Sequence, residues 1–257
     1  MIDQFKITIP QLTEDEERYA FIYVPDDYDS CEDIRFPVLY MFDGQNLFYD
    51  ETASFGKSWG LKEYLEEHHV PLIVASAACN THPEDYRLGG RLSEYSPFSF
   101  SDRHFGEITG RGEITMEWLT KEFKPFVDAN YPTLPDRQYT FIAGSSMGGL
   151  MTLYALTNYN DIFSRGCALS PSLSFSSEEV QEMIRSAKMR RKTYLYMDVG
   201  EKELFHGRAE KDWRQDVFLL QKKRIMLETR IVPNGIHSEV TWEKQIPFFM
   251  DFLFYDL

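Results

Sequence analysis

Tyr139-Thr140-Phe141-Ile142-Ala143-Gly144-Ser145-Ser146-Met147-Gly148-Gly149-Leu150 is the stretch that decides the fold. It begins with residues that favour a β-strand, breaks at a glycine and continues with a helical pattern. Gly144-x-Ser146-x-Gly148 has the spacing of a nucleophile elbow, in which a strand turns sharply into a helix and holds a serine at the apex. Cβ atoms at the two glycines would collide across so tight a turn. The helix would aim its N-terminal N–H groups at an oxyanion beside Ser146.

The pattern around this stretch predicts the rest of the fold. Residues 5–9 and 19–24 are rich in β-forming side chains and predict an antiparallel pair at one edge of a sheet. From residue 36 onward, strand and helix patterns alternate, which predicts a mostly parallel sheet with helices on both faces. The expected strands are 36–42, 71–77, 166–170, 193–199 and 226–232, and the expected helices include 59–68, 114–127, 210–223 and 240–252. We therefore expect one α/β domain over residues 1–257, of which 43% are hydrophobic.

Composition excludes several classes of function. The formal net charge of −14 argues against binding to nucleic acid or to an anionic membrane surface. The N-terminus does not resemble a secretion signal, and no apolar run approaches the length of a membrane span. Cys31, Cys79 and Cys167 are widely spaced, which favours free thiols in a reducing compartment, so a cytoplasmic location is expected. No ligand spacing indicates a zinc site, and the glycine-rich stretch has neither the P-loop nor the dinucleotide-binding pattern.

A serine hydroxyl needs a base, and the base needs an orienting acid. In the order typical of the elbow, the acid and then the histidine follow the serine, each on a loop after a strand. Beyond Ser146 lie only His206 and His237, and His237 follows the last predicted strand, where the base belongs. For the acid, Glu203 is favoured because it lies far enough past a strand to curl back, and Asp198, inside the strand pattern, is the alternative.

An acyl-transfer site also needs donors for the oxyanion. We predict the backbone N–H groups of Met147, directly after the serine, and of Gln45, in the loop that follows the strand at 36–42. Gly44 would let the backbone approach closely. Residues 79–112 show no periodicity, and an irregular segment of this length in a compact domain is usually functional, so we expect it to cover the active site.

Four motifs give the chain a family resemblance. Residues 40–48, the glycine-rich stretch 144–149, Ser170-Pro171-Ser172 and residues 237–242 together resemble the putative esterase (esterase D-like) family. That family includes ferric-enterobactin esterase-like proteins, feruloyl and acetyl-xylan esterases, S-formylglutathione hydrolases and mycolyltransferases. The resemblance implies the α/β-hydrolase fold.

The resemblance also implies roles for single residues. It implies a triad of Ser146, Glu203 and His237; because the family's acid is often Asp, Asp198 stays open. Arg91, Glu94 and Tyr95 are similar to the family's Arg-x-x-Glu-Tyr segment beside the pocket, which implies substrate binding by Arg91 and Tyr95.

These observations predict a serine carboxylic-ester hydrolase that works through an acyl-enzyme and uses no cofactor. The expected partner is a small-molecule ester, and a homo-oligomer is left open. Two alternatives remain at this point. One is an acyltransferase or thioesterase with the same triad, and the other is a hydrolase-fold protein that binds a ligand without turnover.

Overall fold

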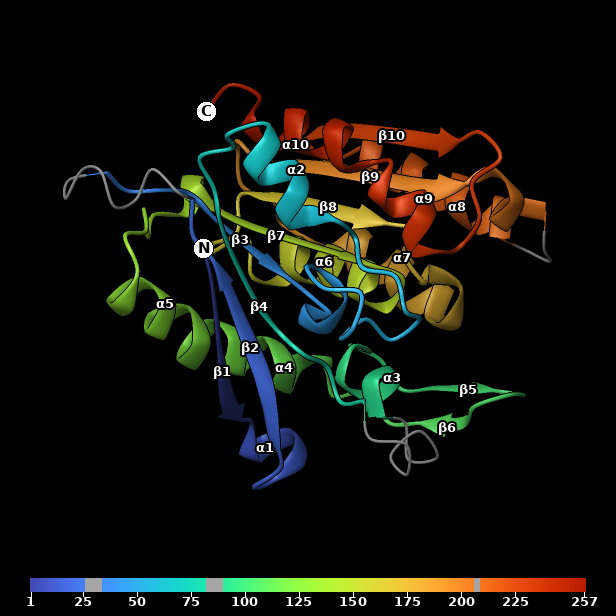
Figure 1. Ribbon diagram of the computed structural model, residues 1–257. Coiled ribbons are helices and arrows are strands. Elements are labelled where there is room, and N and C mark those ends of the chain that lie inside the picture. The colour runs from blue at the N-terminus through green and yellow to red at the C-terminus, as the bar shows by residue number, and fades with distance from the viewer. Residues whose placement is uncertain (26–33, 82–89, 206–208) are drawn as a thin grey trace.

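The computed structural model describes residues 1–25, 34–81, 90–205 and 209–257 (Figure 1). Within these ranges the main sheet has eight strands in the order β1-β2-β4-β3-β7-β8-β9-β10. Their bounds are β1 Ile2–Thr8, β2 Glu17–Tyr23, β3 Val38–Met41, β4 Ile73–Ala77, β7 Thr140–Ser145, β8 Arg165–Leu169, β9 Tyr194–Gly200 and β10 Met226–Val232. Six neighbouring strands of this sheet run parallel: β4, β3, β7, β8, β9 and β10. Strand β2 is antiparallel to both of its neighbours, β1 and β4. The sheet predicted from the alternating pattern, with its antiparallel N-terminal edge, is confirmed.

Helices cover both faces of this sheet (Figure 1). Neighbouring residues of the central strands face opposite sides, so Tyr40 packs in one apolar core and Leu39 in the other. The core that contains Tyr40 lies under α4 Gly112–Trp118, α5 Lys124–Asn130, α6 Met147–Asn158, α7 Ser177–Ser186 and α8 Ala209–Gln221. The core that contains Leu39 lies under α2 Leu61–Glu67, α9 Glu239–Glu243 and α10 Ile246–Phe254. The carboxyl ends of the parallel strands are therefore left for the loops that build a site.

Two prolines change helices that were predicted as regular. The helix expected at 114–127 is continuous but contains a π-helical turn, Leu119–Phe123, between α4 and α5. Pro125 follows this turn, and the wider turn relieves the clash of its ring with the carbonyl four residues earlier. The helix expected at 240–252 is instead two helices, α9 and α10. Pro247 lies in the first turn of α10, where a missing N–H costs nothing.

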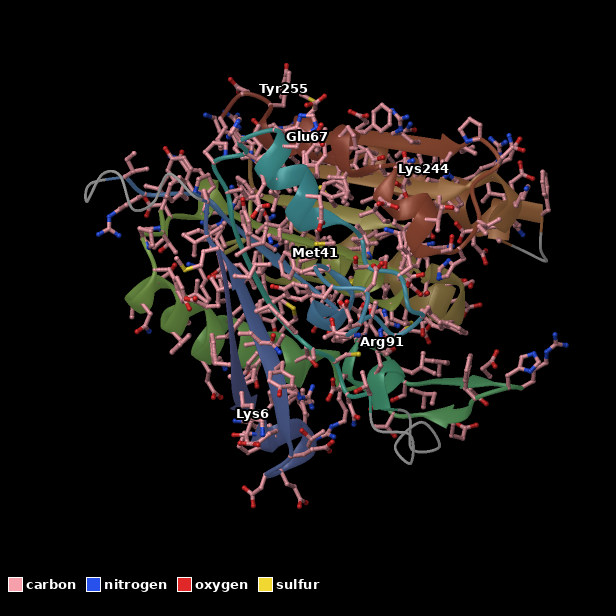
Figure 2. All side chains as sticks on the ribbon, in the orientation of Figure 1. Lys6, Met41, Glu67, Arg91, Lys244 and Tyr255 are labelled. Atoms are coloured by element: carbon pink, nitrogen blue, oxygen red, sulfur yellow. The ribbon has the colours of Figure 1, made fainter. Side chains whose placement is uncertain are left out.

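The described part of the segment 79–112, residues 79–81 and 90–112, contains regular elements that were not predicted. It contains a short helix, α3 Gly90–Glu94, and an antiparallel hairpin of β5 Phe100–Asp102 and β6 Gly106–Ile108. Arg91 lies on α3, between the sheet and this hairpin (Figure 2). Another short helix, α1 Pro10–Thr13, follows β1. Elements of three to five residues are too short to show a hydrophobic period, so the sequence pattern could not reveal them.

Cys79 and Cys167 are buried free thiols, as expected, whereas Cys31 and His206 lie outside the described residues. None of the helices in the described ranges has both the length and the apolar character needed to cross a bilayer.

Candidate active site

The predicted elbow is a sharp turn between β7 and α6. Ser146 lies at its apex with φ 59° and ψ −121°, a strained conformation for a residue with a side chain. A Cβ at Gly144 would lie 2.7 Å from the backbone carbon and oxygen of Gly148, and one at Gly148 would lie 3.0 Å from Cβ of Phe42. Gly144 is therefore required by the collision across the turn that the sequence predicted, whereas Gly148 is confined by Phe42, which lies outside the turn.

The structure brings Ser146, His237 and Glu203 together. Nε2 of His237 lies 2.8 Å from Oγ of Ser146, and Nδ1 lies 2.6 Å from Oε2 of Glu203. Glu203 lies in a helical turn, Glu201–Phe205, directly after β9, and His237 lies in the loop between β10 and α9. The backbone N–H of Lys202 donates to the carbonyl of Gly235, which ties these two loops to each other.

Glu203 is held by donors on its second oxygen. Oε1 accepts hydrogen bonds from the backbone N–H of Gly200 at 2.8 Å and from the hydroxyl of Ser170 at 2.7 Å. The indole N–H of Trp242 donates in turn to the Ser170 oxygen at 3.1 Å. Burial acts to raise the pKa of Glu203, but the bonds from His237, Ser170 and Gly200 outweigh it and hold the pKa below its ordinary value. Glu203 is thus ionised at neutral pH.

Sequence reasoning did not assign Ser170 and Trp242 to this network. Ser170 directly follows β8, at the carboxyl end of a parallel strand next to the elbow strand. That position was the available signal, because the ends of neighbouring parallel strands meet at one edge of the sheet. Trp242 also stacks on the buried Trp59 and contacts the His237 ring edge to face, so it shares the core and the site.

Asp198, the alternative acid, has other partners. It is buried near the end of β9, where its carboxylate accepts hydrogen bonds from the backbone N–H of Ser170 at 3.1 Å and from the hydroxyl of Tyr196 at 3.2 Å. Burial raises the pKa of Asp198 to about 7. Among the described residues, the carboxylate bonded to Nδ1 of His237 is that of Glu203.

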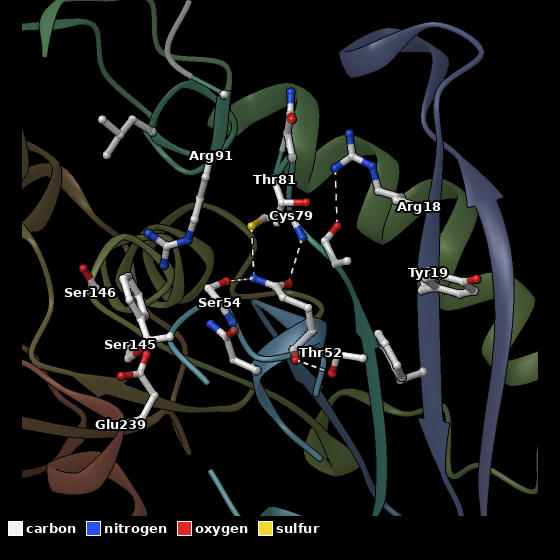
Figure 3. Close-up of a pocket in the computed structure, with 18 of the residues that line it drawn as sticks. Arg18, Tyr19, Thr52, Ser54, Cys79, Thr81, Arg91, Ser145, Ser146 and Glu239 are labelled. Atoms are coloured by element: carbon white, nitrogen blue, oxygen red, sulfur yellow. Dashed lines mark hydrogen bonds between the residues drawn. The ribbon is translucent and has the colours of Figure 1, made fainter. Parts of the chain in front are cut away.

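The loop after β3 is fixed at several points. The hydroxyl of Thr52 donates to the carbonyl of Gln45 at 2.7 Å, and the Gln45 side chain bonds the backbone N–H and the thiol of Cys79 (Figure 3). A Cβ at Gly44 would lie 2.8 Å from Oγ of Ser76, so this close approach requires glycine. Among the described residues, no protein acceptor is bonded to the backbone N–H of Gln45 or of Met147. Both N–H groups are therefore free for another acceptor.

The α3 segment braces this loop. Arg91 makes two bonds of 2.6 Å to the carboxylate of Asp43, whose φ is 62°, and the Asp43 N–H donates to the hydroxyl of Tyr95. Glu94 forms a buried ion pair with Arg18 at 2.8 Å. Arg91 is partly exposed and lines the same cavity as Ser146. Tyr95 is buried and is not part of the cavity wall. The Arg-x-x-Glu-Tyr segment thus bonds the loop after β3 and the strand β2.

A cavity of about 1230 Å³ opens above Ser146 and His237 (Figure 3). This volume exceeds the usual range for a small-ligand pocket, so the cavity has room for more than a short acyl chain. Residues from the segment 79–112 form one wall: Cys79, Asn80, Thr81, Gly90, Arg91, Leu92 and Phe105. The described residues contain no cluster of side chains able to hold a metal ion.

Known proteins share this fold. The structure of the BES protein from Bacillus cereus superposes with a TM-score of 0.70 at 19% identity, over 99% of this chain and 95% of that one. An IroE-like serine hydrolase from Shewanella oneidensis also gives a TM-score of 0.70 at 19% identity, over 94% of this chain and 77% of that one. These similarities show the α/β-hydrolase fold.

Sequence comparison shows the family. An uncharacterized protein, YbbA of Bacillus subtilis (strain 168), is 27% identical over 186 residues, which are 71% of this chain and 67% of YbbA. The sequence model of the family described as Putative esterase matches residues 13–248, which is most of the chain. Membership supports ester hydrolysis in general terms, with a small-molecule ester as substrate. The chain belongs to the putative esterase family.

Proposed function

We propose that the protein is a serine carboxylic-ester hydrolase that forms an acyl-enzyme on Ser146. The observation that carries this proposal is the continuous chain of hydrogen bonds from Ser146 through His237 to Glu203, on the wall of a large cavity. Family membership agrees with ester hydrolysis as the reaction class.

In the first half of the reaction, Nε2 of His237 takes the proton of Ser146 as Oγ attacks the ester carbonyl. The carbonyl oxygen becomes an oxyanion, which the backbone N–H groups of Met147 and Gln45 stabilise. The positive end of the α6 dipole acts in the same direction. When the intermediate collapses, His237 gives its proton to the leaving alcohol, and the acyl group stays on Oγ.

In the second half, water replaces the alcohol. His237 takes a proton from the water as it attacks the acyl carbonyl, and the same two N–H groups stabilise the second oxyanion. His237 then returns the proton to Oγ of Ser146, and the carboxylic acid leaves. Throughout, the ionised Glu203 keeps a proton on Nδ1, so that Nε2 can accept one, and it stabilises the imidazolium that forms.

Residues 1–257 would form one α/β-hydrolase domain in this account, with the segment 79–112 as part of the cover of the active site. The support for that role is the wall that Arg91, Leu92 and Phe105 contribute to the cavity. Arg91 would hold the Gln45 loop through Asp43 and would present its remaining N–H groups to the substrate.

Hydrolysis of p-nitrophenyl acetate and butyrate tests the proposal. Wild type should turn over both esters, and Ser146→Ala and His237→Ala should each lower kcat by about 10⁴-fold or more, because the triad acts as a unit. Ser186→Ala and His68→Ala change exposed residues of the same types and should match wild type. Turnover that survives Ser146→Ala would contradict the proposal.

A further inference from the structure

Glu239 is a carboxylate on the wall of the active-site cavity. It is the first residue of α9, two residues after His237, and it lines the cavity together with Ser146 and His237 (Figure 3). Only 8% of the residue is exposed. Glu239 therefore shares the cavity in which the proposed nucleophile and base lie.

Glu239 has no protein partner among the described residues. No hydrogen bond or ion pair joins its carboxylate to another described side chain, although Glu243, one helical turn later, pairs with Lys57 at 3.0 Å. The Glu239 oxygens are not among the fully buried unpaired atoms of the described residues, so they keep some access to solvent. A carboxylate that faces a cavity without a protein donor is therefore available to a ligand.

The arginines on the cavity wall do not offset this charge. Arg18 donates hydrogen bonds to both oxygens of Glu94, and Arg91 donates to both oxygens of Asp43. Each of these pairs is close to neutral as a unit. Two further carboxylates line the described wall, Glu16 and Glu17, and both are exposed, whereas Glu239 is buried and has no ionic partner among the described residues.

We propose that Glu239 is a specificity-determining residue that selects esters carrying a positive charge and disfavours esters carrying a carboxylate. This inference rests on the proposed function. A carboxylate near the reacting carbonyl repels the oxyanion as it develops, and a cation on the substrate compensates for that repulsion. A second anion on the substrate would instead meet the like charge of Glu239 on the cavity wall and be repelled.

Three p-nitrophenyl esters of similar length test the inference. They are the butyrate, the 4-(trimethylammonio)butyrate and the monoester of glutarate, and the measured quantity is the ratio of kcat/KM for the cationic ester to that for the anionic ester. In wild type this ratio should exceed about ten, the size expected of a partly screened charge pair across a few ångströms. The trimethylammonium group cannot donate a hydrogen bond, so a preference for the cationic ester does not come from a hydrogen bond to Glu239.

Glu239→Gln should lower the ratio about tenfold or more, whereas the matched variant Glu243→Gln should leave it at the wild-type value, since Glu243 does not line the cavity. A wild-type ratio of one or less would overturn the inference without any variant. An unchanged ratio in Glu239→Gln would also overturn it. Turnover of the neutral butyrate by wild type but not by Ser146→Ala would show in the same assay that the proposed function stands even where the inference fails.

Discussion

Replacing Glu203 by Gln should remove most of the activity without changing the shape of the site. One oxygen of Glu203 accepts hydrogen bonds from Gly200 and Ser170, and the other faces Nδ1 of His237. In Glu203→Gln the amide oxygen should take the position between the two donors. An NH₂ group there would face the backbone N–H of Gly200, and two donors cannot bond each other. The NH₂ group would then face Nδ1.

The consequence is the wrong tautomer of His237. A donor opposite Nδ1 favours the imidazole with its proton on Nε2, and this form cannot accept the proton of Ser146. The loss of an acid in this position costs about 10⁴-fold in kcat, or roughly 5 kcal/mol of activation free energy. Asp198→Asn is the matched control. It removes a buried carboxylate that bonds Ser170 and Tyr196, and we expect kcat to change less than about tenfold.

The assay is kcat and KM for p-nitrophenyl butyrate, with thermal unfolding of each variant to show that it is folded. The reasoning would be refuted if Glu203→Gln kept more than a tenth of the wild-type kcat. A larger loss in Asp198→Asn than in Glu203→Gln would reassign the acid.

Three further changes follow from the contacts of the site and the core. Ser170→Ala removes a donor from Glu203 and should lower kcat by about tenfold in the esterase assay, since a hydrogen bond to a charged group contributes about 1.5–3 kcal/mol. Gly144→Ala places a Cβ 2.7 Å from the Gly148 backbone and should lower Tm, with a cost of about 1–3 kcal/mol in chemical unfolding. Asp216→Asn should raise the stability at pH 7.5, because burial raises the pKa of Asp216 to about 7.

The sign of the Asp216 effect follows from linkage. The folded protein keeps a proton at Asp216 that the unfolded chain loses above the ordinary aspartate pKa of 3.8, so this group favours folding at low pH, and its contribution is lost as pH rises to about 7. The gain in stability of Asp216→Asn over wild type should grow between pH 4 and pH 7.5, to roughly 4 kcal/mol at most. A gain that is equal at both pH values would contradict the burial of an ionisable carboxyl.

The other two changes have clear contrary results. Wild-type kcat in Ser170→Ala would mean that the bond to Glu203 does not position the acid. An unchanged Tm in Gly144→Ala would mean that the elbow widens without cost, and Ser186→Ala, at an exposed helical position, provides the baseline for both measurements.

The sheet could be predicted because its strands are long enough to show their pattern. Residues 36–42 form a continuous apolar run, which is typical of a parallel strand covered on both faces. The elbow was also accessible, because its glycine and serine spacing is local and a Cβ at Gly144 would meet the backbone of Gly148, although the contact that confines Gly148 itself is with the distant Phe42. Local chemistry therefore predicted the position of Ser146 before any tertiary contact was known.

The rest of the site depends on contacts that no local pattern encodes. Distance past the end of β9 favoured Glu203. One of the bonds that orient it is local, from Gly200, but the others come from Ser170 and, through Ser170, from Trp242, which lie 33 and 39 residues away along the chain. The bracing of Asp43 by Arg91 joins residues 48 apart. Only the resemblance to a family pointed to Arg91, and it suggested contact with a substrate rather than support of the loop.

The central claim is that Ser146 is a nucleophile activated by His237, and covalent labelling measures this most directly. The protein would be treated with a fluorophosphonate, and the intact mass and the modified peptide would be determined for wild type, Ser146→Ala and His237→Ala. The account predicts one adduct per wild-type chain, located on Ser146, no adduct in Ser146→Ala and labelling slowed by orders of magnitude in His237→Ala. An unlabelled wild type, or an adduct on another residue, would contradict it.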